Sequence, residues 1–238
     1  MTAASLLVFA RCAGFVFRAP GLSHPAVPGP VRAGLALALT IAVLPAAASA
    51  HAGSGIMFIS AVALELAIGA AIGIAASILY DGAYAGGRAL DDYVGIRGSV
   101  PNAQVYAASG FGRIWSLVFT AGFFLLGGYR IAILAFAHTF DVFPVGSVPH
   151  SRDLYAFALT LPQGIVEAAL LVAGPAIALV FVAQLALGSL ARVTPRFSGF
   201  TLTFPIMFGA ALLATIAGVP ALFEQSAVPW LKLVFIHG

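Results

Sequence analysis

The stretch IMFISAVALELAIGAAIGIAASILY, from Ile56 to Tyr80, contains one charged residue, Glu65, in an apolar run rich in alanine and isoleucine. It is longer than the about 20 residues with which an α-helix crosses the hydrocarbon core of a bilayer. Apolar and polar residues do not alternate along it, which favours a helix over a strand of a membrane barrel. The stretch therefore predicts a long apolar helix with a carboxylate in its interior.

The rest of the chain has the same character. Hydrophobic residues make up 61% of the sequence and charged residues 8%, far below the roughly 25% of an ordinary soluble domain. Further apolar stretches lie at about 3–17, 33–50, 114–137, 165–190 and 200–223. We expect an all-α, polytopic membrane-class protein of about six apolar helices, or five if the short first stretch with Arg11 does not span, in one domain covering residues 1–238.

The segment from Val31 to Ala50 has the basic start, apolar core and small-residue end of a secretory signal. It begins far from Met1, after another apolar stretch and several prolines. We interpret it as a retained helix.

Arginine counts predict an orientation. If the six stretches are threaded as spans, the connections 18–32, 81–113 and 191–199 hold seven arginines, and the opposite side holds only Arg152 and Lys232. The positive-inside rule then places the seven arginines in the cytoplasm and both termini outside. No basic run of the kind that binds nucleic acid occurs in the sequence.

The polar residues do not suggest an enzyme. The sequence lacks the common motifs of zinc proteases, serine hydrolases and β-lactamases, and its five histidines have no metal-ligand spacing. Cys12 is the only cysteine, so no intrachain disulfide can form. We expect no catalytic residue, no metal site and no cofactor.

Two acids in apolar surroundings have two interpretations each. Glu65 is either a proton or ion relay, or a structural carboxylate that bonds to a neighbouring helix or to an arginine such as Arg11. Glu167 opens the run from Ile165 and is either an ion site or an acid at a helix N-terminus.

Glycines spaced four apart predict close helix packing. Gly69 and Gly73 form one small-xxx-small face, and Gly82 and Gly86 form another. Such faces pack either within one chain or between subunits.

The stretch GSLARVTPRFSGFTLTFP, from Gly188 to Pro205, predicts a bend between two apolar helices, because Pro195 cannot donate a backbone hydrogen bond and disfavours helix at Thr194. Arg192 at this bend can reach lipid headgroups, cap helix carbonyls or pair with acids of another subunit.

These residues together resemble the FliR/SpaR family of type III secretion export-gate proteins. The likeness is carried by FARCAG (Phe9–Gly14), VPGPVR (Val27–Arg32), GLALAL (Gly34–Leu39), ELAIGAAIG (Glu65–Gly73), TFDVFPVGS (Thr139–Ser147), LGSLARVTPR (Leu187–Arg196) and Phe204-Pro205. The pattern T-F-x-x-x-P-x-G-S is closer to flagellar than to injectisome (SctT-like) members.

The resemblance implies a pore-building subunit of helical hairpins in the inner membrane, within a flagellar basal body or secretion apparatus. It implies FliP-like and FliQ-like partners, and also FlhB-like and FlhA-like proteins, around a path for unfolded substrates. It further implies that part of the connection 94–106 plugs the closed gate, where the bland alternative is a solvated loop. The expected plug residues are Gly98, Ser99, Val100, Pro101, Asn102, Ala103 and Gln104.

Two other functions fit the same hydropathy. One is a secondary transporter or channel that uses Glu65 and Glu167, although the surroundings of the two acids do not form a convincing inverted repeat. The other is a membrane scaffold without a conduit.

Overall fold

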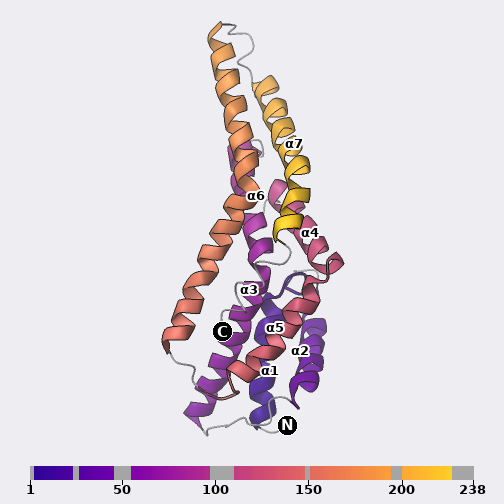
Figure 1. The fold of residues 1–238 in the computed structure, drawn as a ribbon, viewed down its shortest axis with the longest axis vertical. Helices are drawn as coiled ribbons and strands as arrows, with labels where there is room; N and C mark the ends of the chain where they lie inside the picture. Colours follow the sequence, from indigo (N-terminus) through magenta and orange to yellow (C-terminus); the bar gives the residue numbers. More distant parts are fainter. Residues whose placement is uncertain are drawn as a thin grey trace. The chain divides into compact units, whose positions relative to one another are not determined.

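The computed structural model describes residues 3–23, 27–45, 55–96, 110–147, 151–193 and 200–226. Regular structure in these ranges is helical, which confirms the all-α prediction (Figure 1). The helices are α1 (Ala3–Arg18), α2 (Gly29–Val43), α3 (Ile56–Val94), α4 (Gly110–Leu125), α5 (Gly128–Val142), α6 (Ser151–Val193) and α7 (Phe200–Ser226).

Several helix boundaries differ from the prediction. α3 continues well past Tyr80, so Asp81, Asp91 and Asp92 belong to a helix and not to a connection. α6 begins at Ser151, so the expectation that Glu167 lies at a helix N-terminus was wrong. In both cases the helix continues through polar residues. Hydropathy had predicted a helix for the apolar part only.

The predicted helix 114–137 is two helices. α4 and α5 meet at Leu126 and Gly127 with a bend of 74°. Gly127 has a φ of +76°, in the left-handed region that glycine adopts without steric cost. The Gly127-Gly128 pair thus interrupts an apolar run that hydropathy alone reads as continuous.

In the described part of the chain, two helices are long and apolar enough to cross a membrane, α3 with 39 residues and α6 within its 43. The bent pair of α4 and α5 adds a third if it is counted as one span. α1 and α2, with 16 and 15 residues, are shorter than the about 20 that a span needs. The threading of six spans stays a prediction.

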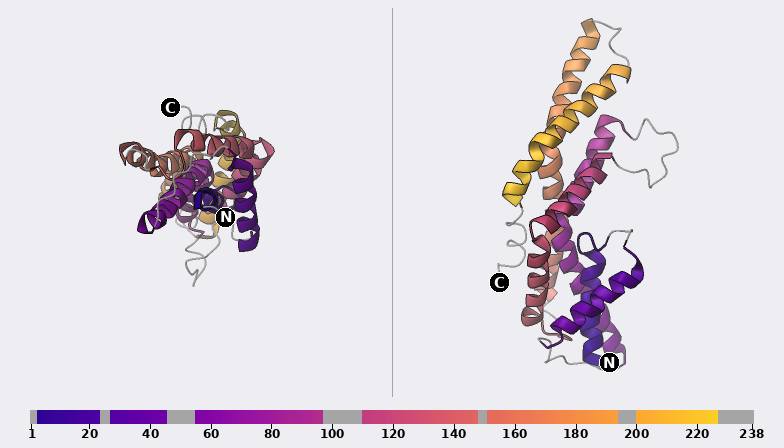
Figure 2. Two further views of the ribbon diagram at one scale, coloured as in Figure 1. Left: turned by 90° about the horizontal axis from the view of Figure 1, so that it is seen from below. Right: turned by 90° about the vertical axis from the view of Figure 1, so that its right-hand side faces the viewer.

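The helices form two compact units. The described residues of the first lie within 3–78 and 123–163. In it α1 packs against α2, α3 and α5 (Figures 1 and 2). Its core is built mainly from buried apolar residues of these helices, among them Leu7, Phe15, Val16, Ile68, Ile72, Phe136 and Phe140.

The described residues of the second unit lie within 79–122 and 164–226. Here α6 and α7 lie side by side (Figure 2), and the end of α3 packs against the start of α4. The rings of Phe111 in α4 and Phe208 in α7 are 5.4 Å apart, so aromatic contacts join these helices. α6 ends at Val193 and α7 begins at Phe200, and the bend predicted around Pro195 lies outside the described residues.

Candidate functional site

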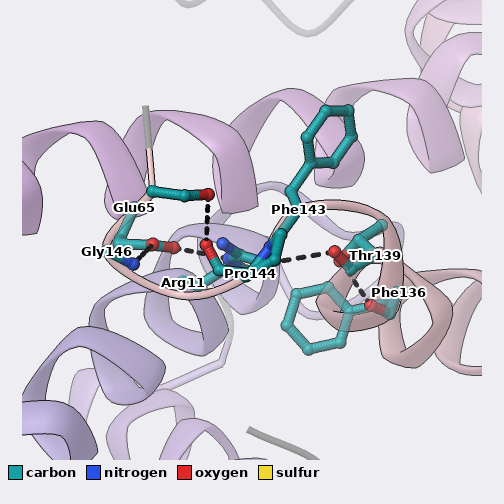
Figure 3. Close-up of polar contacts among 8 residues, drawn as sticks. Arg11, Glu65, Phe136, Thr139, Phe143, Pro144 and Gly146 are labelled. Atoms are coloured by element: carbon teal, nitrogen blue, oxygen red, sulfur yellow. Dashed lines mark hydrogen bonds and ion pairs between the residues drawn. The ribbon is translucent and has the colours of Figure 1, made fainter. Parts of the chain in front are cut away.

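A buried ion pair joins α1 to α3 in the first unit. Nε of Arg11 donates to Oε2 of Glu65 over 2.5 Å, and the two side chains are 0% and 1% exposed (Figure 3). An isolated charge in such a place is costly, whereas a paired one is tolerated. The partner of Glu65 is therefore Arg11, the arginine that the sequence suggested.

Arg11 also binds the end of α5. Its Nη1 donates to the main-chain oxygens of Thr139, at 3.2 Å, and Phe143, at 2.9 Å (Figure 3). The Thr139 oxygen also accepts the N–H of Phe143, and the carbonyls at the end of a helix carry partial negative charge that attracts a cation. The guanidinium therefore acts as a C-terminal cap supplied by another helix.

Glu65 holds the turn that follows α5. Its Oε1 accepts the N–H of Gly146 at 2.9 Å, so both carboxylate oxygens have donors from the chain. Gly146 has a φ of +79°, a conformation that glycine adopts without steric cost. The segment Thr139–Ser147 is thus fixed by one arginine and one glutamate from two other helices.

An aromatic ring lies against the arginine of the ion pair, and further buried rings pack between α1 and α5. Cζ of Arg11 lies 4.6 Å from the centroid of the Phe140 ring, close enough for a cation–π contact. Phe136 stacks on Phe15 with centroids 4.4 Å apart, and all three rings are buried. This apolar surrounding strengthens the electrostatic contacts.

Glycines bring α1 and α3 close enough for the pair to form. A Cβ at Gly69 would overlap the main-chain carbonyl of Arg11, and one at Gly73 would lie 2.8 Å from the main-chain oxygen of Phe15. Gly14 on α1 meets Leu66 and Ala70 in the same way. The face of Gly69 and Gly73 therefore packs within the chain.

The chemistry of this site is that of a fixed connector. Since both oxygens of Glu65 accept hydrogen bonds and the guanidinium has three bonds to the chain, the pair links α1, α3 and the end of α5. A carboxylate that relays protons has to exchange its proton with donors and acceptors along a conduction path. These contacts favour the structural interpretation of Glu65.

A second buried acid organises the other unit. Oδ1 of Asp91 accepts the N–H of Phe111 at 2.9 Å, and its side chain is buried. Nearby, a Cβ at Gly87 would lie 2.7 Å from the carbonyl carbon of Phe111. α3 and α4 are therefore in backbone contact beside the acid.

The Gly82 and Gly86 face packs on α6. A Cβ at Gly82 would lie 2.9 Å from the main-chain oxygen of Ile165, and one at Gly86 would lie 2.7 Å from that of Ala169. Both small-xxx-small faces of α3 thus contact helices of the same chain.

The remaining predicted site residues lie elsewhere. Glu167 is exposed in the interior of α6, and Arg192 is exposed in its last turn. Pro195 and the expected plug residues 98–104 lie outside the described residues. Among the residues that are described, no three His, Cys, Asp or Glu side chains lie together as a metal site would need.

The sequence did not predict the structural roles of two features, the turn 143–147 and Asp91. The signal for the turn was Gly146 after Pro144, a pair typical of a tight turn. Asp91 stood in a polar segment that hydropathy assigned to a connection. The distant amide that it binds had no sequence signal.

Comparison with known proteins gives a coherent result. Residues 2–230 match the family described as bacterial export proteins, family 1. The chain is also 28% identical over 223 residues to the flagellar biosynthetic protein FliR of Escherichia coli (strain K12), which covers 90% of this chain and 84% of that protein.

Proposed function

The chain belongs to the family of bacterial export proteins, family 1, and we propose that it is a pore-building subunit of a type III protein export gate of the flagellar kind. In this role it helps to pass unfolded export substrates across the bacterial inner membrane. The observation that carries the proposal is the family match, which extends over residues 2–230. The similarity to the flagellar protein FliR favours the flagellar branch.

The proposed partners are FliP-like and FliQ-like subunits, with FlhB-like and FlhA-like proteins of the same apparatus. The surface of α6 supports a role in assembly, because apolar side chains are exposed along its length. Leu170 is 66% exposed and Val182 60%, so lipid or other subunits must cover them. A subunit of a larger membrane complex meets both requirements.

Co-purification from the native host tests the proposal. We expect an affinity-tagged chain, expressed from its own promoter and extracted in mild detergent, to carry FliP-like and FliQ-like proteins at fixed ratios. Mass spectrometry of the purified complex identifies them. Recovery of the tagged chain without any export-apparatus protein, from cells that assemble flagella, would contradict the proposal.

Two glutamate variants separate the gate from a secondary transporter. In a transporter that uses both acids, Glu65→Gln and Glu167→Gln each abolish transport. In the gate, we expect Glu167→Gln to secrete normally, because this side chain is exposed and the substitution keeps its shape. Solute uptake by vesicles that contain this chain alone would favour the transporter.

A further inference from the structure

A proline interrupts the hydrogen bonding of α6 near the middle of its candidate span, Ala156–Arg192. Pro175 has no N–H, so the main-chain oxygen of Leu171, four residues before it, loses the donor that a helix otherwise provides. α6 has no serine or threonine between 161 and 188 whose hydroxyl could replace that donor. The helix therefore continues past Pro175 with one main-chain acceptor that it does not satisfy itself.

This oxygen lies on an uncovered side of α6. Leu171 is 38% exposed, and the Pro175 side chain is exposed as well. The ring of a proline in a helix meets the carbonyl four residues before it, so the Leu171 oxygen lies on the side of the exposed ring. Its donor therefore comes from a molecule that covers this side.

Glu167 adds a second acceptor to the same face. Positions 167, 171, 174 and 178 follow one another at helical spacing, so they form one face of α6, called here the Gly174 face. The Glu167 side chain is exposed within the candidate span. A carboxylate in a membrane-spanning segment faces protein or water and not lipid. Both polar groups of the face thus require donors.

The middle of the Gly174 face is open and lined by small residues. A Cβ at Gly174 would meet nothing within 4 Å, and Ala178 is exposed. Small residues let the backbone of another helix approach closely. Lipid tails offer no donor, and a two-fold contact between copies of the chain would set the acceptors of one Gly174 face against those of the other. The face is therefore complementary to a helix of a different protein that carries hydrogen-bond donors.

We propose that the Gly174 face binds a helix of a different subunit, which presents basic or hydroxyl-bearing side chains to Glu167 and to the main-chain oxygen of Leu171. That the subunit belongs to an export gate rests on the function proposed above, whereas the docking itself does not.

Proline variants separate this contact from the stability of α6. Pro175→Ala restores the missing N–H, so the helix itself satisfies the Leu171 oxygen. We expect the isolated chain in detergent to unfold at a higher temperature, while the amount of complex on native gels falls about fivefold, as for one lost hydrogen bond. Pro162→Ala is the control, because Pro162 is exposed near one end of the candidate span and on another side of the helix. It should stabilise the isolated chain and leave the amount of complex unchanged.

Glutamate variants test the second acceptor. Glu167→Lys sets a donor against the donors of the partner helix, and we expect it to reduce the complex by about fivefold or more. Glu167→Gln keeps an acceptor oxygen and should leave the complex unchanged. Asp141→Lys is the matched control, since this acid of α5 is 67% exposed and lies outside the Gly174 face.

Photocrosslinking identifies the molecule that covers the face. We expect a photoreactive amino acid at Ala178, in cells that assemble the complex, to join the chain to a helix of another protein. Mass spectrometry of the product should find a basic or hydroxyl-bearing residue beside the joined position.

The outcomes are distinct. Crosslinks from Ala178 only to lipid or to a second copy of the chain overturn the proposal, as does an undiminished complex in Pro175→Ala or an equal loss in Pro162→Ala. Crosslinks to a protein outside the export apparatus uphold the docking and contradict the proposed function. A parent chain that co-purifies with export-apparatus proteins while Ala178 joins none of them supports the proposed function and overturns the docking.

Discussion

The main-chain carbonyl of Arg11 in α1 lies where a Cβ at Gly69 of α3 would stand. Gly69 follows Glu65 by four residues, so the glycine and the acid lie on the same face of α3. The close approach of the two backbones at Gly69 therefore sets the distance across which Arg11 reaches Glu65. Packing and charge pairing at this contact depend on each other.

Replacing this glycine should loosen the first unit. We expect Gly69→Ala to destabilise the chain by at least about 1–3 kcal/mol, because its Cβ meets backbone and not a flexible side chain. Thermal unfolding of the purified chain in detergent measures the loss. Gly174→Ala is the control, since a Cβ there meets nothing within 4 Å; a loss of equal size at both sites would contradict the packing argument.

The ion pair should show strong coupling. We expect Arg11→Met or Glu65→Leu alone to cost about 3–5 kcal/mol, because each leaves the other charge buried without its partner. The double variant should cost clearly less than the sum. Unfolding of all four chains in mixed micelles gives the coupling energy.

The exposed pair of His138 and Asp141 provides the comparison. Its atoms are 3.3 Å apart, but the side chains are 68% and 67% exposed. We expect His138→Ala and Asp141→Ala to leave unfolding unchanged, because exposed pairs contribute little. If the free-energy costs of the Arg11 and Glu65 variants are additive, the two side chains are not coupled, and the ion pair does not act as a buried connector.

How far the sequence predicts this site depends on the kind of signal. A carboxylate in an apolar helix requires a partner, and Arg11 was a candidate because it is also a charge in an apolar stretch. The four-residue spacing of Gly69 and Gly73 likewise predicts close packing, without naming α1 as the helix that approaches. Composition and spacing therefore predicted which residues make contacts at this site. The tertiary fold determines which residues they contact.

Other features have no such local signal. The bend at Gly127 lies within an apolar run, where hydropathy is uniform and only backbone conformation marks the break. The bond from the Phe111 amide to Asp91 joins residues twenty positions apart across a connection. Contacts of this kind arise from tertiary packing, and one sequence alone does not reveal them.

The turn after α5 should depend on glycine at position 146. We expect Gly146→Ala to cost about 1–2 kcal/mol, because an L side chain is disfavoured at a φ of +79°. Distortion of the turn would also weaken the hydrogen bond to Glu65. Thermal unfolding measures the cost, with Gly174→Ala as the control, because a Cβ at that glycine meets nothing within 4 Å. Equal stability of Gly146→Ala and the parent would show that the turn tolerates another conformation.

Arg192 is predicted to act in assembly. It is exposed in the last turn of α6, where a cation is favoured by the helix dipole and remains available to other molecules. We expect Arg192→Ala to reduce the amount of complete complex on native gels, with Arg130→Ala, another exposed arginine, as the control. Undiminished complex together with normal secretion would exclude the role.

The segment from Gly98 to Gln104 is predicted to seal the closed gate, as its resemblance to the FliR/SpaR family implies. Gly98, Pro101 and Asn102 favour turns in the sequence, so we expect this segment to lie outside the bilayer or against a cavity and not in contact with lipid. We expect its deletion to leave the complex assembled but permeable to small solutes when secretion substrates are absent. Replacement of the seven residues by glycine and serine keeps the length of the connection and should leak as well. Bilayer conductance measures both, and an assembled deletion complex as tight as the parent would identify the segment as an ordinary solvated loop.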